Sequence, residues 1–130
     1  MRTIGYPRVT AIDDAIEIIA DDKNEKNGNA SHHYYVRIPP KKDKGGIVAD
    51  IHFQDGPINE VGVNGVGQEA ILAILIDRLQ CFQSSKYSCK ENAVALTHLE
   101  EALNMLNSRT LKRKMYGVEG THELCAVEAK

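Results

Sequence analysis

The stretch that decides the fold is residues 67–117, GQEAILAILIDRLQCFQSSKYSCKENAVALTHLEEALNMLNSRTLKRKMYG. Its first part places apolar residues on one side of a helix: Ala70, Ile71, Ile74, Leu75 and Phe82. The neighbours Leu72, Ile76 and Leu79 widen that side. The spacing predicts a helix that starts near Gly67 and is apolar enough to be buried against more than one layer.

A second, longer helix follows after a short link, residues 83–87. Ser88 and Glu91 have the spacing of a capping box, which marks a helix start, and Gly117 is a typical stop. Between them a heptad seam repeats at 3,4 spacing: Cys89, Asn92, Leu96, Leu99, Leu103, Leu106 and Thr110. Because the link is short, we expect the two helices to be antiparallel and to form a helical hairpin over 66–117.

The N-terminal residues predict another helix. Thr10 and Asp13 have capping-box spacing, and apolar residues recur after them at helical intervals. This pattern predicts an amphipathic helix over 11–22.

The residues between this helix and the hairpin predict a small sheet. Residues 34–38 are typical of a strand, which Pro39-Pro40 should end because proline cannot donate to a strand ladder. Ile47, Ala49, Ile51 and Phe53 recur at every second position, which predicts a strand over 47–53 with one buried face, and 58–63 is expected to return as its partner. The predicted fold class is therefore α+β, with an N-terminal helix and small antiparallel sheet followed by a C-terminal antiparallel helical hairpin.

Length and charge limit the class of protein. The chain has 130 residues, which favours a single domain with a helix plus β core over 1–65, the hairpin over 66–117 and a tail over 118–130. Sixteen Lys and Arg against eighteen Asp and Glu give a net charge of −2, which argues against binding to nucleic-acid polymers. No apolar stretch is long enough to cross a bilayer, so we expect a soluble intracellular protein without a membrane partner. Three cysteines without CxxC spacing favour reduced, mostly buried thiols.

No catalytic or metal-binding motif is recognisable. The five histidines are scattered without the spacing of a metal site, and no serine lies in a GxSxG elbow. The glycine-rich segment 62–67 lacks the Lys-Ser/Thr of a P-loop, which favours a tight strand-to-helix turn over a phosphate cradle. We therefore expect no catalytic residue, no metal and no cofactor.

Two residues near the hairpin tip are candidates for binding a base. Asn92 occupies a seam position where leucine is expected, either to set the register or to bind a ligand. Phe82 lies near it across the short link. An aromatic face beside an amide offers what a purine requires, namely stacking and paired hydrogen bonds.

Basic residues crowd the other end of the long helix: Arg109, Lys112, Arg113 and Lys114. They either interact with the negative helix end or bind an anion. Arg113 also continues the seam, so its guanidinium should meet a buried acid or face a pocket that takes a phosphate. Arg109 and Arg113 lie about 25 to 30 Å beyond Asn92 at roughly 1.5 Å per residue. Either there are two separate sites, or a second subunit brings its helix end to this hairpin tip.

Three blocks of the sequence resemble one family. They are VGVNGVGQEAILAILIDRL at 61–79, CKENAVALTHLEEALNMLNSRT at 89–110 and GVEGTH at 117–122. Together they resemble the phage Thoeris anti-defence sponge family, and the C-terminal part also resembles the helical hairpin of phage anti-CBASS sponges. Gly67 and Gln68 stand where we expect Thr and Asn in the family.

The resemblance implies a binder without catalytic activity. Members of the family sequester cyclic ADP-ribose isomers, such as glycocyclic ADP-ribose, and so block Thoeris signalling in the cytoplasm of the infected bacterial host. Relatives also capture cyclic di- and trinucleotides of CBASS at a separate site. The family forms homo-oligomers, as dimers and often hexamers, with ligands at subunit interfaces.

The resemblance also implies roles for particular residues. Phe82 and Asn92 would stack on adenine and hydrogen-bond to it. Phosphate and ribose would be held at an interface by a second set: Arg109, Arg113, Glu119, Gly120 and Thr121. Two alternatives stay open, an enzyme that hydrolyses the same signal and a helical dimerisation module that binds no ligand.

Overall fold

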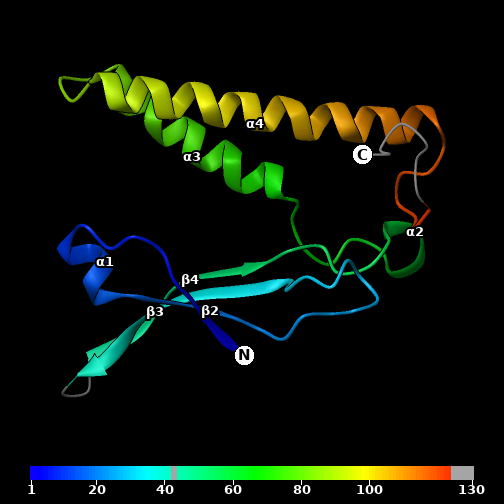
Figure 1. Ribbon diagram of the computed structural model, residues 1–130, viewed down its shortest axis with the longest axis horizontal. Coiled ribbons are helices and arrows are strands. Elements are labelled where there is room, and N and C mark those ends of the chain that lie inside the picture. Colours follow the sequence, from blue (N-terminus) through cyan, green and yellow to red (C-terminus); the bar gives the residue numbers. More distant parts are fainter. Residues whose placement is uncertain (42–43, 124–130) are drawn as a thin grey trace. The chain divides into compact units, whose positions relative to one another are not determined.

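The N-terminal part of the chain forms a four-stranded antiparallel sheet (Figure 1). The structure is a computed structural model that describes residues 1–41 and 44–123. The strands follow one another in the sheet as they do in the chain: β1 (Arg2–Ile4), β2 (Glu17–Ala20), β3 (His33–Lys41) and β4 (Lys44–His52). Ile19 and Ala20 of β2 are buried, because this strand has a neighbour on each side. The predicted α+β class and the small antiparallel sheet are confirmed.

The N-terminal helix is much shorter than predicted. α1 (Ala11–Ala15) has five residues and the expected capping box, in which the Thr10 hydroxyl accepts from the Asp13 N–H and the Asp13 carboxylate accepts from the Thr10 N–H. Hydrogen bonds from the Thr10 and Val9 backbone lower the pKa of Asp13 to about 2. The backbone becomes extended at Ile16 and continues as β2. The prediction of a helix over 11–22 is therefore wrong beyond its first turn.

Strand pairing explains why the helix ends so early. Ile18 and Ile19 pair with β1 on one side and with Val36 and Tyr35 of β3 on the other. Branched side chains such as isoleucine fit a pleated strand better than a helix. Helix propensity differs by only about 1 kcal/mol or less between ordinary residues, so two-sided pairing outweighs the helical period of the sequence.

The two central strands are confirmed, with a correction at the prolines. β3 contains the predicted strand 34–38 and β4 contains most of 47–53. Pro39-Pro40 lies inside β3 and does not end it. β2 pairs with β3 only as far as Arg37, and the β3–β4 register shifts after Ile38, so the prolines lie where missing donors are tolerated.

Residues 58–63 do not form a strand, so that prediction is wrong. β4 pairs with β3 instead, and α2 (Ile58–Val61) is a single helical turn between Pro57 and Gly62. Proline presets the backbone for a helix start, and Gly62 ends the turn with a positive φ of 74°. By contacts the chain divides into two compact units, residues 1–56 with 63–66, and residues 57–62 with those from 67 onward.

The helical hairpin is confirmed, apart from its predicted cap. α3 (Gln68–Gln83) and α4 (Lys90–Met115) run antiparallel and side by side (Figure 1). The N-cap of α4 is Cys89, whose Sγ accepts from the Asn92 N–H at 3.4 Å, so the capping box at Ser88 is wrong by one residue. The seam is at least half-buried at every predicted position after Cys89: Asn92, Leu96, Leu99, Leu103, Leu106, Thr110 and also Arg113.

α3 shields most, but not all, of its predicted apolar side. The shielded residues are Ile71, Leu72, Ile76, Leu79 and Phe82, whereas Ile74 and Leu75 are 63% and 43% exposed. Within its own unit α3 packs against α4, and burial of this helix against a further layer stays a prediction.

Two further expectations concern cysteines and membranes. Cys81 and Cys89 are exposed, so the expectation of buried thiols is wrong for them, and Cys125 lies outside the described residues. None of the helices in the described part of the chain is long and apolar enough to cross a membrane.

Gly65 allows the chain to pass close to the end of β4. A Cβ atom at this position would lie 2.5 Å from the Phe53 carbonyl carbon and 2.6 Å from the His52 carbonyl oxygen. We expect Gly65→Ala to lower the free energy of unfolding by about 1 to 3 kcal/mol, the usual effect of overpacking. A thermal melt followed by circular dichroism measures it. Gly5→Ala is the control, because a Cβ there meets nothing within 4 Å; equal melting temperatures for the two variants would contradict the prediction.

Candidate functional site

Phe82 presents an aromatic ring at the closed end of the hairpin. It lies in the last turn of α3 and is half-buried. Tyr87 packs edge-to-face against the ring, with centroids 6.5 Å apart, and the Arg78 guanidinium lies 5.0 Å from the ring centroid. The Phe82 ring thus contacts an aromatic ring, from Tyr87, and a cation, from Arg78.

Side chains bonded to the backbone order the link between the helices. The Gln83 amide donates to the Cys89 carbonyl at 3.2 Å and accepts from the Cys89 N–H at 3.1 Å. The Ser85 hydroxyl donates to the Phe82 carbonyl at 2.7 Å and accepts from the Tyr87 N–H at 3.1 Å. These bonds fix the start of α4, where Asn92 lies half-buried in the first turn. The predicted pair, Phe82 and Asn92, therefore lies on the two helix ends that this link joins.

Arg113 lies near the far end of α4, and its side chain is only 7% exposed. Its Nε donates to Glu119 Oε2 at 3.2 Å. Further bonds go to backbone carbonyls of the following loop: Val118 at 3.0 Å, Thr121 at 3.1 Å and Glu123 at 3.1 Å. Of the two alternatives for this guanidinium, the structure shows an acid partner, but Glu119 is half-buried, with 34% of its side chain exposed.

The loop that Arg113 organises contains the other predicted residues of this set. Gly120 has a positive φ of 81°, and its carbonyl accepts from the Asn59 N–H of α2 at 3.2 Å. The Thr121 hydroxyl donates to the Val118 carbonyl at 2.5 Å. Arg109 lies one helical turn before Arg113 and is exposed.

The two predicted sets are far apart in one chain. α4 is continuous from Lys90 to Met115, so Asn92 and Arg109 are separated by about 25 Å at roughly 1.5 Å per residue. A single chain therefore does not bring the pair predicted to bind a base and the basic end of α4 together on one small ligand.

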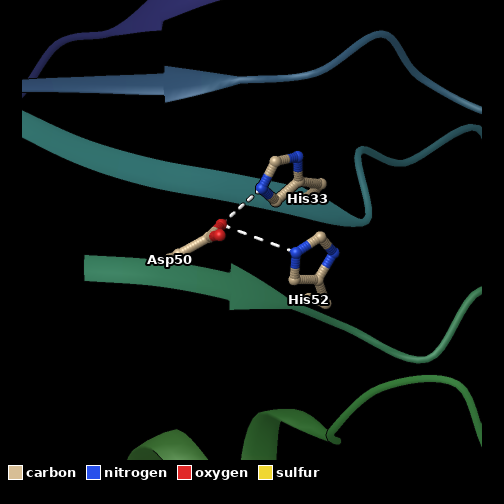
Figure 2. Close-up of side chains that lie close together, drawn as sticks. All are labelled: His33, Asp50 and His52. Atoms are coloured by element: carbon tan, nitrogen blue, oxygen red, sulfur yellow. Dashed lines mark hydrogen bonds and ion pairs between the residues drawn. The ribbon is translucent and has the colours of Figure 1, made fainter. Parts of the chain in front are cut away.

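A third cluster, which sequence reasoning missed, lies on the sheet (Figure 2). His33 on β3 and Asp50 and His52 on β4 form the group. Asp50 Oδ1 lies 2.5 Å from His33 Nε2 and 3.6 Å from His52 Nε2, and the two imidazole rings stack at 4.1 Å. Strand alternation puts Asp50 and His52 on one face, but only the β3–β4 register, with His33 opposite His52, completes the group.

The cluster is strongly polar. The Asp21 carboxylate, directly after β2, is hydrogen-bonded to His33 Nδ1 at 2.6 Å. Hydrogen bonds to Asp21 and then to Asp50 raise the pKa of His33, and the bond to His33 lowers the pKa of Asp50. A pocket of about 280 Å³ adjoins it, lined by Asp22, Asn24, His32, His33, His52, Phe53, Asp55 and Asn64.

Comparison with known proteins identifies a family that shares the helical hairpin. A family model for the Acb2/Tad1 hairpin domain matches residues 45–111. Thoeris anti-defense 1 of Bacillus phage SBSphiJ7 is 41% identical over 128 aligned residues, which cover 82% of this chain and 89% of the relative. These matches define a class of phage anti-defence protein built on this hairpin. The chain belongs to the phage Thoeris anti-defence sponge family, as the resemblance of its sequence blocks predicts.

Removing the Arg113 side chain should destabilise the loop it holds. Arg113→Met removes the bond to Glu119 and the bonds to the Val118, Thr121 and Glu123 carbonyls, and we expect a loss of about 2 to 4 kcal/mol in the free energy of unfolding. Urea denaturation measures this loss. Arg109→Met, on the exposed face of the same helix, should change stability by no more than about 0.5 kcal/mol; similar values for both variants would contradict the assignment.

His33 should titrate above its usual range. In EDTA-treated protein, we expect NMR to give a His33 pKa above 6.5, because Asp21 and Asp50 favour its charged form. Protonated His33 therefore stabilises the folded state. This contribution is fully present below the pKa of His33 in the unfolded state and is lost as the pH rises through its pKa in the folded state. Asp21→Asn and Asp50→Asn should each bring the pKa back down; an unchanged value in both would show that these carboxylates do not control it.

Proposed function

We infer that this protein sequesters a cyclic ADP-ribose isomer, such as glycocyclic ADP-ribose, and thereby blocks Thoeris signalling. The observation that carries this proposal is family membership through the hairpin, together with an aromatic ring and an amide at one end of that hairpin and basic residues at the other. A nucleotide signal with a base and phosphates requires both kinds of contact. Sequestration would take place in the cytoplasm of the infected bacterial host.

In this proposal, Phe82 stacks on adenine and Asn92 hydrogen-bonds to it. Phosphate and ribose contacts come from Arg109 and from the loop residues Glu119, Gly120 and Thr121. Because the Arg113 guanidinium is bonded to this same loop, we assign Arg113 a positioning role.

The distance along α4 supports a ligand site shared between subunits. A partner subunit would bring its basic helix end to the hairpin tip of the first, and the reciprocal contact would form a second site. The exposed apolar residues of the hairpin offer surface for such an assembly: Ile74, Leu75, Val94, Met105, Leu111 and Met115. We propose a homodimer as the smallest functional form, with hexamers built from dimers.

The affinity that such a site can reach suits a stoichiometric sponge. A ligand of about 35 to 45 heavy atoms, at about 0.3 kcal/mol per atom, binds with about −10 to −13 kcal/mol. This free energy corresponds to a nanomolar dissociation constant.

One observation favours a second candidate, hydrolysis of the same signal. The His33, Asp50 and His52 cluster has the ligand types with which a metal ion activates water. A cyclic di- or trinucleotide of CBASS bound at a separate site is a further possibility within the sponge proposal.

Ligand release after heating separates a sponge from an enzyme. The protein is incubated with glycocyclic ADP-ribose, once with EDTA and once with Zn²⁺, and the free ligand is measured before and after heat denaturation. We expect depletion in both samples and intact ligand after heating. A breakdown product would indicate hydrolysis, and no depletion at micromolar protein would leave the dimerisation module as the better account. Parallel incubations with cyclic di- and trinucleotides test the second site.

Substitutions at the hairpin tip test the base-binding pair. Loss of stacking on an aromatic ring is worth about 1 to 3 kcal/mol, so Phe82→Ala should raise the dissociation constant roughly 10- to 100-fold. We expect a comparable effect for Asn92→Ala, with the oligomeric state unchanged in light scattering. Asn104→Ala, at an exposed position of α4, is the matched control. Wild-type affinity in both Phe82 and Asn92 variants would refute the assignment.

A further inference from the structure

Three potential metal ligands meet on one face of the sheet unit (Figure 2). They are two imidazole nitrogens and a carboxylate oxygen, from His33, His52 and Asp50, and the three atoms lie within 4.8 Å of one another. Their side chains are 27%, 59% and 50% exposed, so an ion in solution can reach them. Paired β-strands hold their backbones, which limits how far the ligands can drift apart.

Asp21 gives this cluster the outer support that metal sites use. A histidine ligand usually donates its second ring N–H to a carboxylate, which fixes the tautomer and orients the ring. His33 Nδ1 lies 2.6 Å from Asp21 Oδ2, which leaves Nε2 directed at Asp50. Asp21 is itself held in place, because its N–H donates to the His33 carbonyl and its own carbonyl accepts from the buried Ser31 hydroxyl at 2.8 Å.

The distances are close to those that a small metal ion requires. A tetrahedral zinc ion keeps ligand atoms about 3.3 Å apart, given bonds of roughly 2.0 Å. The two nitrogen–oxygen distances of the cluster are 2.5 Å and 3.6 Å, on either side of that value. The imidazole rings are stacked nearly parallel, at 5°, so one of them must rotate to aim its lone pair at a shared ion. His52 is the more exposed of the two and is the ring free to do so.

We propose that His33, Asp50 and His52 bind one divalent transition-metal ion, with Asp21 as the supporting carboxylate. Two imidazoles and one carboxylate suit zinc, iron or cobalt better than calcium or magnesium, which prefer all-oxygen sites. Three protein ligands leave at least one position for water or for an anionic group in the adjoining polar pocket. All of these residues belong to the sheet unit, and none is part of the proposed nucleotide site.

Titration of tag-free protein with Co²⁺ tests this site, because bound Co²⁺ absorbs visible light and Zn²⁺ displaces it. We expect one equivalent of Co²⁺ per chain and complete displacement by Zn²⁺. His52→Ala and Asp50→Asn should each weaken binding at least 10-fold, and Asp21→Asn should weaken it about 10- to 100-fold, as is usual for a supporting carboxylate.

His98→Ala is the matched control. His98 lies on α4 with Glu101 3.6 Å away, so it forms a histidine–carboxylate pair without a second histidine. The His98→Ala variant should bind Co²⁺ like the wild type. Circular dichroism of all metal-free variants should show unchanged folding. The exposed position of His52 keeps its variant informative even if Asp50→Asn unfolds the sheet.

Three results would overturn the proposal. One is no Co²⁺ absorption up to millimolar metal. Another is binding that His52→Ala and Asp50→Asn leave unchanged. The third is an intense thiolate charge-transfer band, which would place the ion on the exposed Cys81 or Cys89. Each of these outcomes leaves the nucleotide-binding proposal untouched, because that proposal depends on ligand depletion by the hairpin.

Discussion

The 3,4 spacing of the α4 seam is the constraint on which the hairpin depends. α4 has 26 residues and α3 has 16. The last ten residues of α4, a length of about 15 Å, therefore have no counterpart in α3. The seam nevertheless continues through Thr110 to Arg113, which are half-buried and buried. At this end of α4 the Arg113 side chain bonds to Glu119 and to the Val118, Thr121 and Glu123 carbonyls of the loop that follows the helix. α4 thus packs against α3 over its first part and is bonded to the following loop at its last turn.

This division of α4 has a direct consequence for binding. A continuous helix keeps Asn92 and Arg109 about 25 Å apart at roughly 1.5 Å per residue, so one chain cannot place both on one small ligand, and the proposed function therefore places the ligand between two copies. The exposed Ile74 and Leu75 of α3 are consistent with such a copy, because an apolar strip of this kind is unfavourable in water. The low supply of aromatic and basic residues argues against nucleic-acid polymers, and it does not argue against the small nucleotide ligand of the proposed function.

The sheet shows where local patterns fail. Residues 16–20 have helical spacing and residues 58–63 have strand character, yet the first segment is extended and the second contains a helical turn. In both cases the outcome depends on partners distant in sequence, since β2 pairs with β1 and β3, and the Asn59 N–H of α2 donates to Gly120. Short apolar segments carry too little propensity to resist such contacts.

The sequence by itself determined the α+β class, the limits of both hairpin helices to within a residue or two, the seam of α4 and the family. The class, the helix limits and the seam rest on long periodic segments and on caps, whose signals are local. The family rests on the resemblance of three sequence blocks, which the comparisons confirm. Only the tertiary structure decided the strand pairing, which residues of the apolar side of α3 are shielded, the burial of Arg113 beside Glu119, and the meeting of His33 with Asp50 and His52. Those outcomes depend on register and on contacts between residues far apart in the chain, which no local spacing encodes.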